Sequence, residues 1–223
     1  AGTETFLDPR ADTVDISRLS ELLSSKAFAQ LAQEFERISS RPDIPLPPFL
    51  KFLTVLAGES FEQSFGFKAS QVERAASCAV YADKSVSVVF SMREPIQWEN
   101  VVSRLEKFLK VQFRKTGVHR GVELLDLAVP AAQDRVFAFV EPKVALFGTA
   151  QAVRQSIDRR SSRRPPGLPA LVTEAMENAT VPRHAQVVRV LRPTPDMLAL
   201  FPPGESEVRW IVLTVEATEV FVI

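Results

Sequence analysis

The stretch Ser77–Met92, "SCAVYADKSVSVVFSM", decides the fold class of this sequence. It contains two short apolar runs, one on each side of Asp83-Lys84. Short apolar runs joined by two polar residues are typical of a β-hairpin. We therefore predict two antiparallel strands here, in a sheet that further strand pairs of the same kind complete.

The segment after this hairpin predicts a helix and then more strands. Pro95 suits the first turn of a helix. Apolar residues at three- and four-residue spacing then share one face, namely Trp98, Val101, Val102, Leu105, Phe108 and Leu109. We predict strands over residues 111–119, 122–128, 135–140 and 144–147, and a helix over residues 149–160. The expected inner face of that last helix holds Ala152, Val153, Ser156 and Ile157.

The segment before the hairpin has a helical pattern instead. One face of the first predicted helix is formed by Leu19, Leu22, Leu23, Ala27, Leu31, Phe35 and Ile38. Asp15 or Ser17 is expected to cap its start, and Pro47-Pro48 to open a second helix. We expect residues 1–70 to form a helical segment that packs on the unit that follows.

The C-terminal part repeats the hairpin pattern weakly. Residues 161–167, "SSRRPPG", have the composition of a linker. Beyond it we predict a helix over residues 168–179 and strands over 184–191, 207–217 and 219–223. The last two strands share with the Ser77–Met92 hairpin an apolar strand, a tight acidic turn and a second apolar strand. This copy stops at Ile223, which a shortened or truncated unit would explain.

Together these patterns predict an α+β fold, with antiparallel sheets covered by helices and two units related to the ferredoxin-like type. Strict alternation of one helix per strand is missing, so a doubly wound parallel sheet is not expected. The predicted division of the chain is an N-terminal helical segment (1–70), a first α+β unit (71–160), a linker (161–167) and a second, shorter α+β unit (168–223).

Composition limits the function classes. The chain has 27 Lys and Arg against 27 Asp and Glu, and this balance argues against a general nucleic-acid binder. No apolar run approaches the roughly 18 residues that suggest a membrane span. The single cysteine, Cys78, excludes an intramolecular disulfide and a zinc site of the cysteine type. The chain starts at Ala1, and either a chosen boundary or removal of a targeting segment would explain that start.

The stretch Val144–Gly167 has a pattern with which many phosphate-binding turns begin, because a strand, Gly148 and a helix follow one another there. A phosphate-binding loop needs a glycine-rich turn with Lys and a hydroxyl residue, and a dinucleotide fingerprint needs three spaced glycines. Neither is present. We therefore interpret Gly148 as the exit of a strand into a helix capped by Thr149.

Two groups of residues are candidates for binding. The first is a basic run near the linker that could dock an acidic partner, formed by Arg154, Arg159, Arg160, Arg163 and Arg164. The second is a crowded set of phenylalanines that could line an apolar groove or a dimer face, formed by Phe49, Phe52, Phe61, Phe65 and Phe67. In both cases the alternative is ordinary structure: a solvated face for the arginines and core packing for the phenylalanines.

Catalytic and metal-binding patterns are missing from the sequence. His119 and His184 have no partner at metal-ligand spacing. Carboxylate pairs such as Glu205 and Glu207 have no context that would raise a pKa. We therefore expect no catalytic residue, no metal and no cofactor.

The run from Val72 to Arg160 resembles a segment of exported bacterial proteins. The likeness rests on "VER" before an apolar hairpin, on "REPIQWENVVSRLEKFL", and on "DRVFAFVEPKVALFGTAQAVRQSID". These motifs are structural, so the resemblance supplies no catalytic residues. It implies an extracytoplasmic (periplasmic or secreted) α+β protein with duplicated units.

The function expected from the sequence is that of a non-catalytic, extracytoplasmic binding or scaffold protein that uses an apolar groove or a sheet edge. The alternative is a small ferredoxin-like enzyme with a site built from few polar residues. The expected partner is a protein or an apolar ligand, a homodimer is a further expectation, and nucleic acid is not expected.

Overall fold

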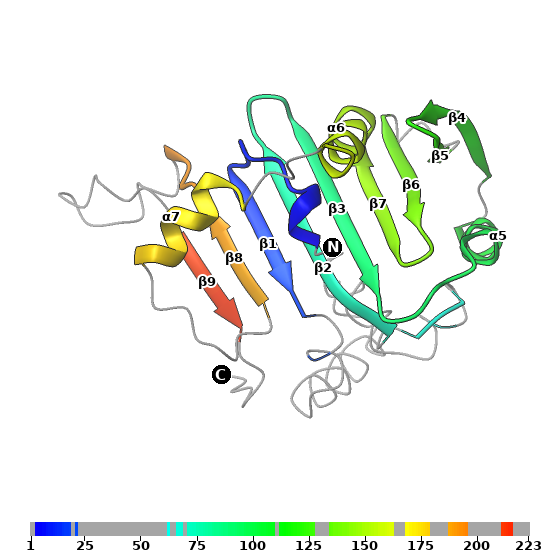
Figure 1. The fold of residues 1–223 in the computed structure, drawn as a ribbon, viewed down its shortest axis with the longest axis horizontal. Coiled ribbons are helices and arrows are strands. Elements are labelled where there is room, and N and C mark those ends of the chain that lie inside the picture. The colour runs from blue at the N-terminus through cyan, green and yellow to red at the C-terminus, as the bar shows by residue number, and fades with distance from the viewer. Residues whose placement is uncertain are drawn as a thin grey trace, which may run out of the picture.

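The computed structural model confirms the α+β class, with one large antiparallel sheet and few helices (Figure 1). It describes residues 3–18, 21, 62, 66–68, 71–109, 112–127, 134–162, 168–178, 187–195 and 211–215. The predicted helices within residues 19–61 and the predicted strand over 219–223 lie outside these ranges.

Nine strands of the described residues form the sheet, in the order β4-β5-β6-β7-β3-β2-β1-β8-β9. In chain order they are β1 (Thr13–Ser17), β2 (Val72–Val80), β3 (Ser85–Met92), β4 (Phe113–His119), β5 (Val122–Leu127), β6 (Arg135–Glu141), β7 (Val144–Thr149), β8 (Val187–Leu191) and β9 (Ile211–Val215). Every neighbouring pair is antiparallel.

Helices make the long connections of the sheet. Helix α5 (Trp98–Leu109) carries the chain from β3 to the far edge strand β4. Helices α6 (Ala150–Arg160) and α7 (Ala170–Asn178) carry it from β7 across to β8. A short 3-10 helix, η1 (Thr3–Phe6), precedes β1. The sheet therefore grows outward on both sides of a central β3-β2 hairpin.

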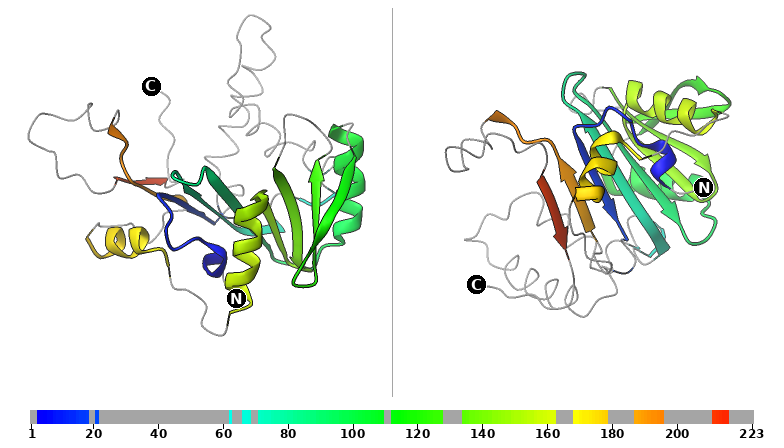
Figure 2. Two further views of the ribbon diagram at one scale, coloured as in Figure 1. Left: turned by 90° about the horizontal axis from the view of Figure 1, so that it is seen from above. Right: turned by 60° about the vertical axis from the view of Figure 1, so that its left-hand side comes forward.

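The helices cover both faces of the sheet (Figure 2). On one face η1, α6 and α7 bury the larger hydrophobic cluster, whose most buried members include Phe6, Leu146 and Val153. On the other face α5 packs over a smaller, aromatic cluster around Trp98. The Trp98 ring stacks on Phe139 with 4.7 Å between ring centroids.

The hairpin predicted from Ser77–Met92 is present as β2 and β3. Alternate residues of β2 are buried from Ala76 to Val80, as a strand with one face on a core requires. The strand next to β3 is β7, and its Gly148 lies against the β3 backbone. A Cβ at this position would come within 2.1 Å of the Val86 carbonyl oxygen. Gly148 is thus a point of close approach between two strands, just before the helix begins.

Strand β1 corrects one expectation. Asp15 and Ser17 do not cap a helix, because both belong to a strand between β2 and β8. The Asp15 carboxylate accepts a hydrogen bond from Ser77 at 2.9 Å and pairs with Arg189 across the sheet. A short segment with polar residues at alternate positions joins the sheet because its neighbours satisfy those polar groups.

The two predicted α+β units contribute to a single sheet. Strands β2 to β7 come from residues 71–160, and β8 and β9 come from residues 168–223. Strand β1 joins the two groups through antiparallel pairing on both of its sides. The ferredoxin-like relationship and the division into units remain predictions.

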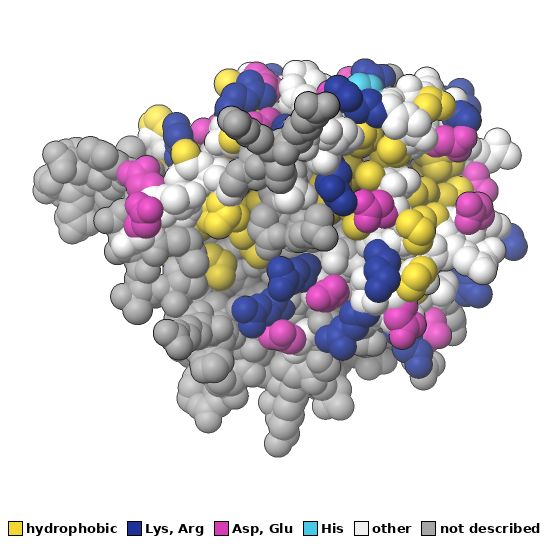
Figure 3. All heavy atoms as spheres, viewed as in Figure 1, with side chains coloured by type: hydrophobic (Ala, Val, Ile, Leu, Met, Phe, Trp, Pro, Cys, Tyr) yellow, Lys and Arg dark blue, Asp and Glu magenta, His cyan; other side chains and the backbone are white. Residues whose placement is uncertain are grey.

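The surface on the face covered by η1, α6 and α7 mixes charges of both signs (Figure 3). Hydrophobic side chains gather over β6 and β7, between α6 and α5. Among the described residues, no helix is both long enough and apolar enough to cross a membrane.

Candidate functional site

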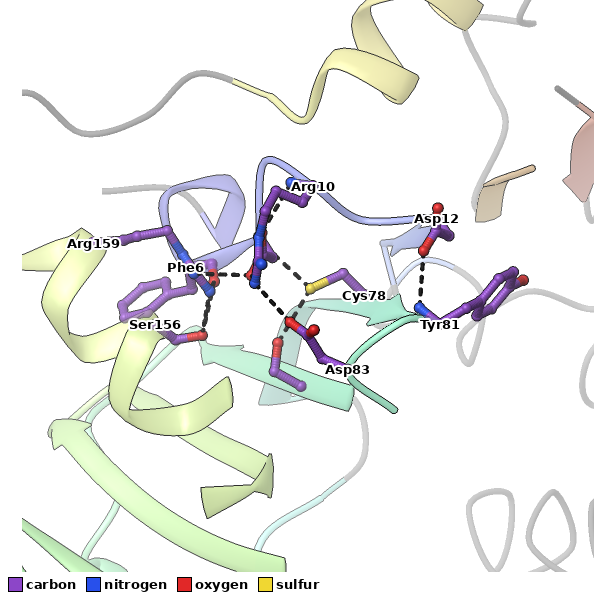
Figure 4. Close-up of polar contacts among 10 residues, drawn as sticks. Phe6, Arg10, Asp12, Cys78, Tyr81, Asp83, Ser156 and Arg159 are labelled. Atoms are coloured by element: carbon purple, nitrogen blue, oxygen red, sulfur yellow. Dashed lines mark hydrogen bonds and ion pairs between the residues drawn. The ribbon is translucent and has the colours of Figure 1, made fainter. Parts of the chain in front are cut away.

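A polar cluster of the described residues lies where residues 3–11, called the strap here, cross over β2, β3 and α6 (Figure 4). The strap inserts Phe6 and Leu7 fully into the larger core. It then turns at Asp8, whose side chain is only 7% exposed. The cluster thus combines apolar anchors with a buried carboxylate.

Helix α6 supplies the polar partners of the strap. Ser156, fully buried, donates a hydrogen bond to the Phe6 carbonyl oxygen at 2.9 Å. Arg159 donates through Nη2 to the same oxygen at 2.9 Å, and its Nη1 lies 3.4 Å from Asp8 Oδ2. One turn of helix therefore binds a backbone carbonyl and a carboxylate of the strap together.

Strands β2 and β3 contact the side of the strap that faces the sheet. The Asp8 N–H donates to Cys78 Sγ at 3.4 Å, and Cys78 Sγ lies 3.2 Å from Ser87 Oγ. Outside the buried part, Arg10 bridges Asp8 and Asp83, with Nη2–Oδ2 distances of 3.2 and 3.0 Å. Figure 4 shows these contacts converging from the strap, the hairpin and α6.

The oppositely charged side chains of the cluster stabilise one another in their ionised forms. Burial opposes ionisation of Asp8, but hydrogen bonds from the Arg10 side chain and backbone and the charge of Arg159 outweigh it, so the pKa of Asp8 is lowered. Burial lowers the pKa of Arg159, and the charge of Asp8 acts against that. The hydrogen bond and charge of Asp8 raise the pKa of Arg10. The cluster is therefore a paired, ionised anchor.

This arrangement is suited to holding a peptide segment. The thiol of Cys78 is buried and contacts a hydroxyl and a backbone N–H. Activating a thiol as a nucleophile needs a base or a strongly electropositive setting. In the part of the chain that the structure describes, no group of three His, Cys, Asp or Glu side chains could hold a metal ion.

The two edges of the sheet differ. Edge strand β4 carries Arg114 and Lys115 on exposed positions, and its register with β5 shifts between Lys115 and Gly117. Charges and bulges on an edge strand hinder pairing with another chain. Edge strand β9 has the sequence Ile-Val-Leu-Thr-Val, carries no charge and pairs with β8 without a register shift.

The hydrogen-bonding direction of β9 follows from its neighbours. Just beyond the paired ends of β8 and β1, the Arg192 N–H donates to the Asp12 carbonyl at 2.8 Å. Bonded positions alternate along an antiparallel ladder, so the next residue, Leu191, turns its backbone groups toward β9. By the same alternation Val212 and Thr214 turn their N–H and C=O groups away from β8.

The structure does not gather the predicted basic run into one surface. Arg159 points inward and is 14% exposed, Arg160 pairs with Glu141 at 2.9 Å, and Arg154 is exposed. Arg163 and Arg164 lie outside the described residues. A docking role for the exposed arginines remains a prediction.

Of the predicted phenylalanine groove, only Phe67 is described. It is 9% exposed and meets Trp98 edge to face, with ring centroids 6.5 Å apart. It is therefore part of the core beneath α5. The other four residues, Phe49, Phe52, Phe61 and Phe65, lie outside the described ranges.

Of the two histidines, His119 is described and His184 is not. His119 Nε2 lies 3.0 Å from Asp158 Oδ1, and Arg120 pairs with the same carboxylate. Partial burial opposes ionisation of Asp158, but these hydrogen bonds lower its pKa. The contact fastens the β4–β5 turn to α6.

Sequence reasoning missed the strap and its cluster. The pairing of Asp8 with Arg159 spans 151 residues, which no local pattern indicates. The alternation of Val14 and Ile16 with polar residues was the available signal for β1.

No family model and no curated protein match the sequence. The comparison with solved structures finds the Treponema protein TP0453 in several crystal forms. Crystal form I is 10% identical with a TM-score of 0.49, over 96% of this chain and 73% of that one. Crystal form IV is 9% identical with the same TM-score, over 95% and 73%. This likeness concerns the course of the chain alone.

Proposed function

We propose that this protein is a non-catalytic binding protein that takes up an extended segment of another protein at the outer edge of β9. The segment would add to the sheet as one more strand, held by main-chain hydrogen bonds. The observation that carries the proposal is the outward direction of the backbone groups of Val212 and Thr214, which follows from the ladder of β1, β8 and β9.

The contrast between the two edges supports this choice of surface. Strand β4 has the charges and register shift that discourage an added strand, and β9 has neither. Figure 1 places the two strands at opposite ends of the sheet. Among the described residues no strand pairs with the outer edge of β9, and an edge strand without such protection is a template for pairing with another chain.

The side chains of β9 indicate which segments would fit. Val212 is half-buried and packs against the larger core, and Thr214 on the same face is exposed. An added strand would continue this face of the sheet beside α7. We therefore expect the bound segment to place apolar, β-branched residues at alternate positions, since these favour a half-buried pleated surface.

The test is selection of peptides from a displayed library of random decapeptides, using the full chain and two variants. Thr214→Pro removes one outward N–H and leaves the β8 pairing intact, because proline is tolerated on an edge strand. Thr214→Val keeps the N–H and serves as the matched control. Circular dichroism establishes that both variants keep the sheet.

The expected result is that the wild-type chain and Thr214→Val enrich peptides with alternating apolar residues, while Thr214→Pro loses them. Failure of the wild-type chain to enrich any such peptide, or equal enrichment by Thr214→Pro, would contradict the proposal. Light scattering of the free chain separates one further outcome. A dimer that Thr214→Pro abolishes would make a second copy the partner.

The proposal includes an extracytoplasmic location. Its support is the resemblance of Val72–Arg160 to segments of exported bacterial proteins. Fractionation of cells that express the natural gene product tests it, and recovery with the cytoplasmic marker alone would contradict it.

A further inference from the structure

We infer that the surface beneath the strap is a second binding site, for a peptide with two adjacent large apolar residues followed by a carboxylate. In this structure the chain's own residues 3–11 occupy it. We name it the strap site and define it by four residues that contact the strap through polar groups: Cys78, Asp83, Ser156 and Arg159.

The polar contacts of the strap site are of the kind by which a protein recognises a peptide. Two donors, the Ser156 hydroxyl and the Arg159 guanidinium, converge on one backbone carbonyl. The same guanidinium faces a carboxylate, so charge and main chain are recognised together. Figure 4 shows Arg159 and Ser156 pointing from α6 toward Phe6.

The apolar contacts supply the rest of the recognition. Phe6 and Leu7 are 2% and 1% exposed, and both belong to the larger core. The segment Phe6-Leu7-Asp8 thus presents two anchors and a charge within three residues. A segment of a partner protein with the same three features would make the same contacts.

The strap can leave without breaking the sheet. Among the described residues, the strap forms no strand pairing, and its link to the sheet begins at Asp12. There the Asp12 N–H donates to the Ala79 carbonyl at 2.8 Å, and its C=O accepts from Arg192. Exchange of the strap for another peptide therefore disturbs η1 and the following turn, and leaves the β1 ladder in place.

The hydroxyl of Thr3 is an unfavourably placed polar group of the strap in this structure. Thr3 is 1% exposed, and its hydroxyl has no hydrogen-bond partner among the described residues. A buried hydroxyl without a partner opposes binding. The strap is therefore not the tightest ligand its own site could take, and a segment with an apolar residue in place of Thr3 should compete with it.

The experiment measures binding of a labelled peptide, residues 2–11 of this chain, to the full-length protein by fluorescence anisotropy. A tethered strap competes at high effective concentration, so the wild-type chain should bind weakly. Phe6→Ala weakens the strap in the protein and leaves the strap site unchanged. We expect this variant to bind the peptide at least about tenfold more tightly than the wild-type chain.

Three control peptides define the chemistry. A peptide with Asp8→Asn should bind at least about tenfold more weakly, since it loses a charged contact. A peptide with Thr3→Val should bind more tightly, and a scrambled peptide of the same composition should not bind.

Several outcomes would overturn the inference. One is a Phe6→Ala chain that keeps its circular dichroism spectrum and fails to bind the peptide. Another is equal binding of the Asp8→Asn peptide. If Phe6→Ala does not fold, the Asp8→Asn chain takes its place, and failure of both variants to fold would show that the strap is inseparable from the core. A wild-type dimer that the free peptide dissociates would reassign the occupant to a second copy.

Discussion

Arg159 Nη1 lies 3.4 Å from Asp8 Oδ2, and this contact joins the last turn of α6 to the N-terminal strap. Both side chains are largely buried, and Arg159 also donates to the Phe6 carbonyl. Removing one partner of a buried ion pair leaves the other charge uncompensated. The contact therefore links the stability of the fold to occupancy of the strap site.

Arg159→Gln should lower the free energy of unfolding by about 1.5–3 kcal/mol, because Asp8 and the Phe6 carbonyl each lose one donor, while Arg10 and Ser156 keep donating to them. Urea denaturation measures this. Arg154→Gln on the exposed side of the same helix is the matched control and should change the stability by less than about 0.5 kcal/mol. Equal effects of the two variants would show that Arg159 acts only as a surface charge.

The stabilisation that Asp8 provides should depend on pH. Since the pKa of Asp8 is lowered on folding, its contribution is fully present above the usual carboxylate range and is lost as the pH falls through the lowered value. The stability difference between wild type and Asp8→Asn should therefore narrow between about pH 5 and pH 2. Urea titrations at several pH values test this, and a constant difference would contradict it.

Thr3→Val should stabilise the protein. The Thr3 hydroxyl is buried without a partner among the described residues, and an apolar side chain of the same shape removes that cost, on the order of 1 kcal/mol. A higher midpoint of thermal unfolding is expected. A lower midpoint would mean that the hydroxyl has a partner in solution.

Gly148→Ala should be strongly destabilising, by about 3 kcal/mol or more, since its Cβ would lie 2.1 Å from the Val86 carbonyl oxygen and backbone cannot easily yield. Gly117→Ala is the control, because nothing lies within 4 Å of a Cβ there. Thermal unfolding compares the two. A mild effect at Gly148 would mean that β3 and β7 separate readily.

Most of the fold that could be predicted follows from local patterns in the amino-acid sequence. The predicted helix over 149–160 matches α6 within one residue, and its expected inner face is buried. The predicted strand over 122–128 coincides with β5 from Val122 to Leu127, and residue 128 lies outside the described residues. These elements follow from periodicity and turn residues within a few positions of one another.

The candidate site could not be predicted in the same way. The position of strand β1 depends on the pairing of Asp15 with Arg189, and that of the strap on the pairing of Asp8 with Arg159. In both pairs the two residues are more than a hundred positions apart in the sequence. The basic run illustrates the limit, since Arg159 and Arg160 are neighbours in sequence but bind different partners on α6's two sides. Only the folded sheet brings such groups together.

The outer edge of β9 is tested most directly by amide hydrogen exchange of the free protein, resolved by residue with NMR. If that edge is open, the amides of Val212 and Thr214 exchange rapidly, while the amide of Leu213 between them is protected by its bond to β8. We predict this alternation of rapid and slow exchange along β9. Protection of Val212 and Thr214 equal to that of Leu213 would mean that the edge is already paired, and would contradict the proposed binding site.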